Sequence, residues 1–367
     1  QGDCLEILQE LPNNSIDSVV TDPPYGLSKE PDIREVLTKW MAGEDYEHRG
    51  GGFMGKTWDS FVPGPSVWRE VYRVLKPGGH ALVFAGTRTQ DLMTISLRMA
   101  GFEVRDVVEW LYFQGFPKSL DVGKAFDKRA GAERKVIGVE LKKAFGYQDR
   151  PWKHREDANI NYITIPSTDL ARKWDGWGTN LKPSHEPIIV VRKPLEGTVA
   201  DNVEKYGTGA INIDATRIAE EGYAEKALRK YSGTVSQDSV GNGFMASNGG
   251  KIECQNPSAL EKGRFPANCI TLESDAFYSK YFNISPPELS KKASKKDRNS
   301  DWRGEEISVG ERNNVHPTVK PTNLMAWLVR LVTPPNGTVL DPFAGSGSTL
   351  VAAKREGFNF VGIELED

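Results

Sequence analysis

Thr338–Leu350 reads TVLDPFAGSGSTL, and the order of residue types in this stretch decides the fold class. A short apolar run, Thr338–Leu340, is followed by Asp341 and by a turn that contains Gly345 and Gly347. Helical apolar spacing then extends to Arg355. Glycines let a backbone adopt positive φ and come close to a ligand, and the first turn of a helix favours negative ligand groups. The stretch therefore predicts a strand, a glycine turn and a helix that together hold a ligand.

The ligand class follows from the residues on either side of the glycine turn. The next strand is expected over Phe360–Leu365, and it places Glu364 about twenty residues after the turn, where an acidic residue commonly holds a ribose hydroxyl pair. The third glycine of the dinucleotide fingerprint is absent, because Ser348-Thr349-Leu350 stands there. This favours a nucleoside without phosphates, such as S-adenosylmethionine, over NAD. The glycines alone also fit a tight connection that binds nothing.

A second unusual stretch is Ser15–Ser28, SIDSVVTDPPYGLS. An apolar strand leads into Asp22-Pro23-Pro24-Tyr25, and tandem prolines force the chain out of the sheet because they donate no backbone hydrogen bond. An amine on a planar ring is a poor nucleophile, since its lone pair is delocalised. Asp22 and the Pro23 carbonyl can accept its two N–H groups while the Tyr25 ring stacks on its face. A purely structural proline corner is the alternative.

Regular α/β rhythm marks both ends of the chain, and a polar, irregular middle separates them. Residues 1–111 and 313–367 alternate strand-like and helix-like segments, so we expect one parallel sheet covered by helices. Between them lie a loop-rich insertion (112–182), a segment with one strand (183–195) and a Gly-, Asn-, Ser- and Lys-rich region (196–312). Long irregular stretches in a compact protein are usually functional or mobile.

The apolar spacing also predicts individual elements. Strands are expected over Ala81–Ala85, Phe102–Trp110 and Ile188–Arg192, and another ends at Val20. Helices are expected over Ser66–Leu75, Thr89–Ala100 and Thr322–Val332, with a turn at Pro77-Gly78-Gly79 after the first.

Taken together, the two motifs resemble the amino-methyltransferases that modify exocyclic nitrogens of DNA bases. Here DPPY precedes FAGSG (343–347), an order similar to the permuted β class, in which target recognition lies between the two motifs. Four further segments resemble that family: GDCLEIL (2–8), VYRVLKPGGHALVF (71–84), SHEPIIVVRKP (184–194) and HPTVKPTNLMAWLV (316–329). The middle, including 112–138, is similar to DNA methylases of phages and bacteria.

The resemblance implies a Rossmann-like, seven-stranded methyltransferase fold of permuted motif order, with a large target-recognition insertion at 196–312. A methyl group would pass from S-adenosylmethionine to the exocyclic amine of a base flipped out of duplex DNA. Adenine N6 is the first choice, because Asp at the start of the motif leans to adenine, and cytosine N4 is the alternative. The catalytic residues would be Asp22, Pro23, Pro24 and Tyr25. The cofactor site would consist of Asp3, Lys320, Asp341, Phe343, Gly345, Gly347 and Glu364.

Basic residues of the middle are candidates for phosphate contacts, although a charge run is also typical of a solvated surface. Trp177, in a glycine-rich loop, can stack on a base or cover a sheet edge. For His185 and His316 the sequence favours local hydrogen bonding over acid–base catalysis. The DNA-binding candidates are Lys124, Lys128, Arg129, Lys291, Lys292, Lys295, Lys296, Arg303 and Trp177.

Composition narrows the setting. A net charge of −3 and a pI near 6.1 exclude a polycationic surface but allow a local basic face. Cys4, Cys254 and Cys269 are too widely spaced for a metal site and form a poor disulfide framework, so we expect a reducing compartment and no metal. No apolar run is long enough to cross a bilayer. The expected location is the cytoplasm of a bacterial or phage-infected cell.

Duplex DNA is the expected partner, and the resemblance also allows a homodimer and a cognate restriction enzyme. Methylation of RNA or of a protein amide is a rival interpretation, and the permuted order and long insertion argue against it. A catalytically silent DNA-binding module is another rival, against which the intact Asp22, Tyr25, glycine turn and Glu364 argue.

Overall fold

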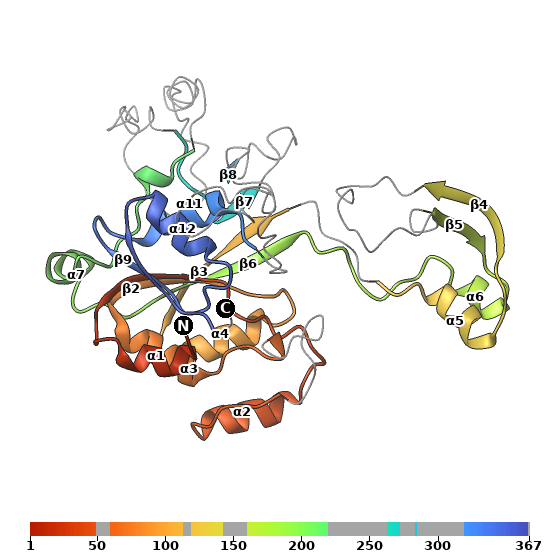
Figure 1. The fold of residues 1–367 in the computed structure, drawn as a ribbon, viewed down its shortest axis with the longest axis horizontal. Coiled ribbons are helices and arrows are strands. Elements are labelled where there is room, and N and C mark those ends of the chain that lie inside the picture. The colour runs from red at the N-terminus through yellow and green to blue at the C-terminus, as the bar shows by residue number, and fades with distance from the viewer. Residues whose placement is uncertain are drawn as a thin grey trace, which may run out of the picture. The chain divides into compact units, whose positions relative to one another are not determined.

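The computed structural model describes residues 1–48, 59–112, 119–141, 160–218, 263–271, 283–284 and 319–365. The chain forms two compact units: unit 1 comprises residues 1–112 and 185–367, and unit 2 comprises residues 113–184 (Figure 1). Some residues singled out in the sequence lie outside the described ranges: Lys291, Lys292, Lys295, Lys296, Arg303 and His316.

The described residues of unit 1 form one sheet of eight strands in the order β10-β9-β1-β2-β6-β3-β7-β8. Their bounds are β1 Ile16–Thr21, β2 Leu75–Phe84, β3 Glu103–Leu111, β6 His185–Arg192, β7 Cys269–Thr271, β8 Asn283–Ile284, β9 Thr338–Asp341 and β10 Asn359–Gly362. Strand β6 is antiparallel to both β2 and β3, and the other pairs are parallel. The α/β fold class is confirmed. The described residues form eight strands in this sheet where seven were expected, and the short β7 and β8 lie beyond β3.

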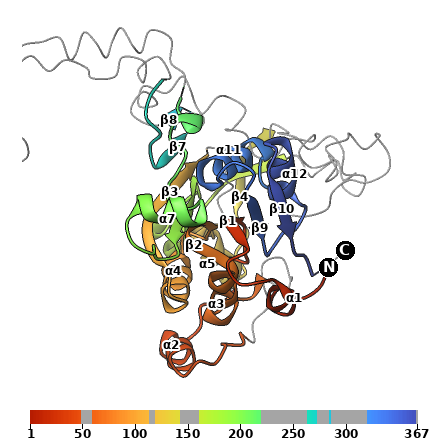
Figure 2. The same ribbon diagram turned by 90° about the vertical axis from the view of Figure 1, so that its left-hand side faces the viewer.

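Helices cover both faces of this sheet, which gives unit 1 three layers (Figures 1 and 2). Helices α1 (Cys4–Glu10), α3 (Pro65–Val74) and α4 (Gln90–Met99) lie on one face, and α11 (Thr322–Val332) and α12 (Ser348–Arg355) on the other. The two faces bury separate apolar clusters, one around Trp68 and Val83 and one around Phe84 and Leu328. Burial of these apolar faces is the main force that holds the layers together.

Besides β7 and β8, the described elements of unit 1 that were not expected from the sequence are the helices α1, α2 (Ile33–Met41) and α7 (Val199–Tyr206) and the 3₁₀ helix η4 (Asp214–Thr216). The turn expected at Pro77-Gly78-Gly79 is instead part of β2. Gly78 has φ +74, and the pairing of β1 with β2 shifts register across this stretch. A bulge therefore absorbs the residues that the sequence assigned to a turn.

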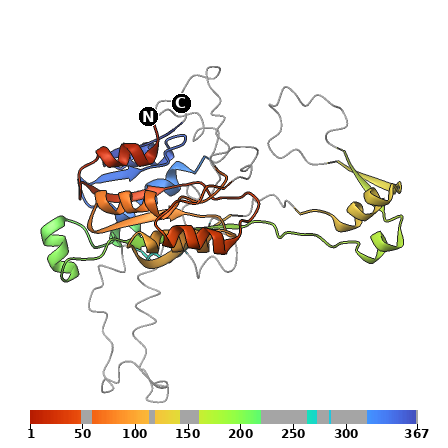
Figure 3. The ribbon, with the colours of Figure 1, turned by 90° about the horizontal axis from the view of Figure 1, so that it is seen from below.

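Parallel pairing brings the two motifs together. Strand β1 lies between β9 and β2 and is parallel to both. Asp22 follows the end of β1 and Asp341 ends β9, so both carboxylates lie at the same edge of the sheet. The first and last described segments also meet, because the Gly2 amide donates to the Glu364 carbonyl at 2.9 Å (Figure 3).

The described residues of unit 2 form a helix, a pair of antiparallel strands and a second short helix. Its elements are α5 (Val122–Ala130), β4 (Lys135–Leu141), β5 (Ile160–Ile165) and α6 (Asp169–Lys173), with β4 and β5 antiparallel. The buried Asp127 carboxylate joins them, since it accepts from the Thr168 amide at 2.9 Å and lies 3.1 Å from the Arg134 guanidinium. A segment that reads as loop-rich therefore contains regular structure around one buried carboxylate.

No helix within the described ranges is long and apolar enough to cross a membrane.

Candidate active site

Asp22 stands at the centre of a buried polar cluster. Its Oδ2 lies 2.5 Å from the Nζ of Lys320, which reaches it from the residues just before α11. Its Oδ1 is buried and makes no hydrogen bond to any residue in the described ranges. One oxygen of the carboxylate is thus engaged, and the other is a buried acceptor that lacks a donor.

A second carboxylate, that of Glu186 at the start of β6, completes the cluster. Its Oε2 accepts a hydrogen bond from the Tyr25 hydroxyl at 3.0 Å and lies 3.4 Å from the Lys320 Nζ. The Lys320 ammonium also lies 5.3 Å from the centre of the Tyr25 ring and 4.9 Å from that of Phe84. The faces of aromatic rings attract cations at such distances, so both rings stabilise the Lys320 ammonium.

The backbone of the Asp-Pro-Pro-Tyr loop is held from two sides. Oδ1 of the buried Asp59 accepts from the amides of Tyr25 at 2.8 Å and Gly26 at 3.1 Å. The Thr89 hydroxyl donates to the Tyr25 carbonyl at 2.5 Å. Gly26 has φ +64, and a Cβ there would lie 2.9 Å from the Val62 amide nitrogen, so the loop requires glycine at this position.

Burial and charge act in opposite directions on this cluster. Burial raises the pKa of Asp22, and the neighbouring Lys320 ammonium opposes that rise. Burial would lower the pKa of Lys320, but the charges of Asp22 and Glu186 outweigh it and the pKa is raised. Lys320 therefore stays protonated at neutral pH, so that one cation faces two carboxylates. Burial, together with the same two carboxylates, raises the pKa of Tyr25, which remains a neutral phenol.

The residues expected to bind the cofactor lie at the neighbouring strand ends. Oδ1 of Asp341 accepts from the Thr21 hydroxyl at 2.7 Å and from the Phe343 amide at 3.1 Å. Burial raises the pKa of Asp341 to about 6. The Phe343 ring packs at 6.1 Å from the ring of Trp68, beside the apolar cluster under the sheet.

The glycine turn has the geometry of a ligand cradle. Gly345 and Gly347 have φ of +52 and +80, and a Cβ added to Gly347 would meet no atom within 4 Å. The Gly345 amide donates to Oε2 of Glu364 at 2.6 Å. Open space above a glycine, beside a carboxylate that a ribose can share, fits a nucleoside ligand such as S-adenosylmethionine.

Asp3 lies beside this turn but is also a helix cap. Its carboxylate accepts from the Leu5 amide at 2.8 Å and from the Glu6 amide at 3.3 Å, at the start of α1. The hydrogen bond from Gly2 to Glu364 keeps Asp3 near the carboxylate that follows β10.

The structure thus gathers Asp22, Tyr25 and Lys320 in one cluster and Asp341, Gly345 and Glu364 in another. Lys320, which we expect to contact the cofactor, lies against the carboxylates of Asp22 and Glu186. Two residues that contact this cluster or its loop, Glu186 and Asp59, were not singled out in the sequence. Glu186 stands next to His185, whose Nε2 lies 3.7 Å from Oε2 of Glu109. The signal for Glu186 was its place just before the strand expected over Ile188–Arg192.

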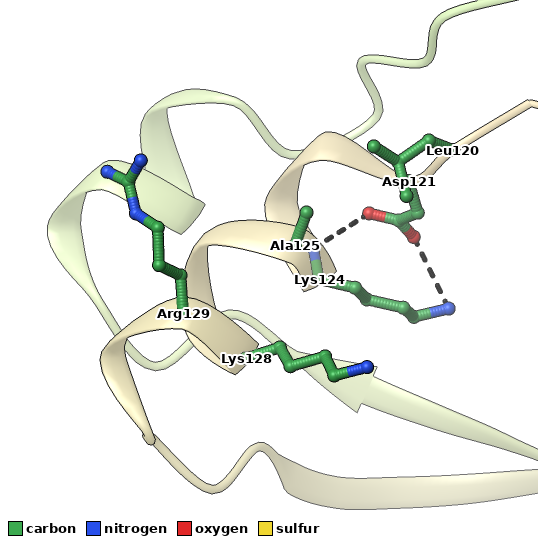
Figure 4. Close-up of a pocket in the computed structure, with 6 residues that line it drawn as sticks. All are labelled: Leu120, Asp121, Lys124, Ala125, Lys128 and Arg129. Carbon is green, nitrogen blue, oxygen red and sulfur yellow. Dashed lines mark hydrogen bonds and ion pairs between the residues drawn. The ribbon is translucent and has the colours of Figure 1, made fainter.

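The described DNA-binding candidates all belong to unit 2. Lys124, Lys128 and Arg129 line one pocket on α5, together with Leu120, Asp121 and Ala125 (Figure 4). Lys124 Nζ lies 3.3 Å from Oδ2 of Asp121, and the Arg129 guanidinium lies 5.3 Å from the centre of the Phe126 ring. Trp177 is 60% exposed and packs edge-on against Trp174.

The described part of the chain contains no group of three or more His, Cys, Asp or Glu side chains that could hold a metal ion.

Comparison with known proteins adds the family. The family model described as DNA methylase (N6_N4_Mtase) matches residues 16–367. The chain is 24% identical over 383 residues to Type II methyltransferase M.HindIII of Haemophilus influenzae, with 99% of this chain and 89% of that protein covered. It is 23% identical over 413 residues to Type II methyltransferase M.SfiI of Streptomyces fimbriatus, with 100% and 87% covered.

Among solved structures, the PvuII DNA methyltransferase (cytosine-N4-specific) is similar with a TM-score of 0.44 and 16% identity, over 100% of this chain and 80% of that one. Because the family model matches nearly the whole sequence, this chain belongs to the DNA methylase family and is a DNA methyltransferase that uses S-adenosylmethionine to modify adenine N6 or cytosine N4.

Proposed function

We propose that this enzyme methylates N6 of an adenine that is flipped out of a specific duplex DNA sequence. The observation that carries the proposal is Oδ1 of Asp22, a buried acceptor without a donor beside the Tyr25 ring. An exocyclic amine supplies the missing N–H donor, and its ring supplies a face for stacking. Asp at the first motif position favours adenine over cytosine in enzymes that this chain resembles.

In this mechanism Asp22 and the Pro23 carbonyl accept the two N–H groups of the amine. This draws the nitrogen lone pair out of the ring and makes it nucleophilic. Pro24 restricts the backbone next to the Pro23 carbonyl. Tyr25 stacks on the base, and its ring is oriented by the hydrogen bond to Glu186. Fixed alignment of this kind supplies much of the rate acceleration in single-displacement reactions.

The cofactor side uses the second cluster. Bound S-adenosylmethionine supplies an electrophilic methyl group. Glu364 would hold its ribose hydroxyls and Asp3 would lie near its adenine. Gly345 and Gly347 would let the backbone approach it, and Asp341 and Phe343 would shape the pocket floor. The hydrogen bond from Gly345 to Glu364 and the open space at Gly347 support these roles.

DNA would be held mainly by the residues between the two motifs, with unit 2 contacting phosphates and residues 196–312 reading the target sequence. Residues 113–184 hold 14 Lys and Arg against 9 Asp and Glu, whereas the whole chain has 47 against 50. A basic segment in an otherwise acidic chain is the electrostatic pattern of nucleic-acid binding. Lys124, Lys128, Arg129 and the exposed Trp177 are its described candidates. Lys291, Lys292, Lys295, Lys296 and Arg303 are proposed in the same role from the sequence.

The similarity to two type II methyltransferases supports a restriction–modification role in a bacterial or phage-infected cytoplasm, with a restriction enzyme that cuts the same site. A homodimer is proposed from the sequence resemblance. Sedimentation of the purified protein with and without DNA tests it.

The test of the function is to incubate a mixed-sequence duplex with tritiated S-adenosylmethionine, digest it to nucleosides and map the modified base by single-molecule sequencing. We expect label in N6-methyladenine. Label in N4-methylcytosine would select the alternative base, and label in 5-methylcytosine or only in RNA would contradict the role of Asp22.

Asp22→Ala should bind cofactor and lose about 100-fold or more in rate. Glu30→Gln, an exposed change just after the loop, is the control.

A further inference from the structure

We infer that Lys320 and Glu186 are positioning residues for Asp22. Lys320 holds Oδ2 and favours the ionised carboxylate while Oδ1 stays free for the target amine, and Glu186 contacts Lys320 and the Tyr25 hydroxyl and gives the cluster a net negative charge. The inference rests on the proposed function only in requiring an exocyclic amine as methyl acceptor, and it holds for adenine or cytosine alike. It moves Lys320 from the cofactor site, where the sequence placed it, to the base site.

The contacts of Lys320 determine which oxygen of Asp22 is available. Its Nζ lies 2.5 Å from Oδ2 of Asp22 and 3.4 Å from Oε2 of Glu186, and its side chain is 7% exposed. The rings of Tyr25 and Phe84 flank the same ammonium. Lys320 is therefore fixed from several directions and holds one carboxylate oxygen in a charge-assisted hydrogen bond. The other oxygen is buried beside it without a donor among the described residues.

The Lys320 ammonium offsets the effect of burial on the Asp22 carboxylate. A carboxyl group taken out of water tends to bind a proton, and a protonated Asp22 would offer the amine a poorer acceptor. An opposite charge within about 4 to 6 Å favours the ionised form. Lys320 provides that charge without occupying the oxygen that the amine needs.

Glu186 sets the net charge of the cluster. Asp22 and Lys320 alone make a neutral pair, which would not stabilise the positive charge that develops on the amine during methyl transfer. With Glu186, the cluster has two negative charges and one positive charge, so its net charge favours the cationic transition state. Glu186 also accepts from the Tyr25 hydroxyl and so orients the stacking ring.

Other groups act on Asp22 as well, and they set the background of any pH profile. Tyr25 and Glu186 face it within the cluster, and Asp341 acts on its charge from the end of β9. Tyr112 hydrogen-bonds to Glu186 from the end of β3. Of these groups, Lys320 is the cation, so its removal and the removal of Glu186 should change the charge state of Asp22 in opposite directions.

The test measures the single-turnover rate of methyl transfer to the mixed-sequence duplex at saturating S-adenosylmethionine between about pH 5 and 9, in wild type, Lys320→Met, Lys320→Arg and Glu186→Gln. The rate falls at low pH as Asp22 gains a proton. In Lys320→Met this acid limb should move up by about 1 pH unit or more. It should stay near its wild-type position in Lys320→Arg and move down in Glu186→Gln. His185→Gln, next to Glu186, should leave it unchanged.

Binding of S-adenosylmethionine without DNA, measured by calorimetry, is the second readout and should stay within about threefold of wild type in all four variants. If the acid limb of the pH–rate profile does not move in Lys320→Met and the variant binds S-adenosylmethionine more weakly, the inference is overturned. Lys320 would then belong to the cofactor site. If Lys320→Met does not fold, Glu186→Gln decides, because an upward shift of its limb contradicts the assignment. Wild-type enzyme that methylates no DNA would instead refute the proposed function.

Discussion

The Thr21 hydroxyl donates to Oδ1 of Asp341 at 2.7 Å, and this bond joins the strand that leads to the catalytic loop with the strand that leads to the glycine turn. Thr21 immediately precedes Asp22, and Asp341 accepts a second hydrogen bond from Phe343 at the start of the turn. The strand end that precedes Asp22 and the start of the glycine turn are therefore linked through one buried carboxylate.

This link has a cost in stability that depends on pH. Burial raises the pKa of Asp341 to about 6. A carboxyl group whose pKa is raised by folding destabilises the folded state when it is ionised. Its contribution to stability is fully present below the pKa of the unfolded state and is lost as pH rises through the folded pKa. Asp341→Asn removes the buried charge, and its Oδ1 can still accept from Thr21 and Phe343. As pH rises from about 4.5 to about 8, the unfolding free energy of the variant should therefore rise by about 2 kcal/mol relative to that of wild type.

Denaturant unfolding of both proteins across this pH range measures the difference. Thr21→Val is the matched variant, because it removes a donor that stabilises the ionised Asp341. Thr21→Val should lose stability relative to wild type as pH rises, in the opposite direction to Asp341→Asn. A stability difference between Asp341→Asn and wild type that does not change with pH would contradict the interpretation.

Asp59 is expected to affect catalysis without touching substrate. Asp59→Ala leaves the Tyr25 and Gly26 amides without their acceptor, and each unsatisfied buried donor costs about 1 to 3 kcal/mol. The loop should lose its fixed position, and the methyl-transfer rate should fall about tenfold or more while cofactor affinity is retained. Asp59→Asn keeps an acceptor oxygen and should retain most of the rate. Equal losses in the two variants would contradict the role given to the acceptor oxygen of Asp59.

The sequence predicted the residues that lie in local motifs and missed those that distant segments bring together. Asp22 and Asp341 were identifiable because strand, turn and helix signals surround each of them. Asp59 has no such local signal, and the signal for Glu186 is only its place just before an expected strand. Glu186 reaches Tyr25 across 161 positions of sequence, and only the pairing of β6 between β2 and β3 places it there. Lys320 was found, but its partner was not, because spacing alone does not say which carboxylate a flexible lysine meets.

The helices of unit 2 were missed for a different reason. Helix α5 (VGKAFDKRA) is short, polar and ends at Gly131, so its pattern is close to that of a loop. Its stability comes from tertiary contacts of the buried Asp127 and from the Asp121 cap, which accepts from the Lys124 amide at 2.9 Å. Intrinsic propensity is a weak guide for such elements.

The basic side of α5 should contribute to DNA affinity through phosphate contacts. The triple change Lys124→Ala, Lys128→Ala and Arg129→Ala should reduce the slope of log affinity against log salt by about 2 to 3, since each phosphate contact contributes about 0.9. Fluorescence anisotropy of a labelled duplex at several salt concentrations measures the slope. The control removes three cations of unit 1, Lys29, Arg34 and Lys39, and should leave the slope near wild type. Equal slopes for both triple variants would indicate a diffuse charge effect.

Gly347 and Gly357, at the two ends of α12, separate backbone strain from ligand contact. Both have positive φ, of +80 and +79, and at both a Cβ would meet no atom within 4 Å. An alanine in this conformation costs about 1 to 2 kcal/mol at either position, so Gly347→Ala and Gly357→Ala should lose similar unfolding free energy. Only the space above Gly347 belongs to the glycine turn beside Glu364. Gly347→Ala should therefore bind S-adenosylmethionine about tenfold or more weakly in calorimetry, because its methyl group enters the space the ligand needs. Gly357→Ala should bind it like wild type. Equal cofactor affinities in the two variants, at equal stability, would exclude the turn from the cofactor site.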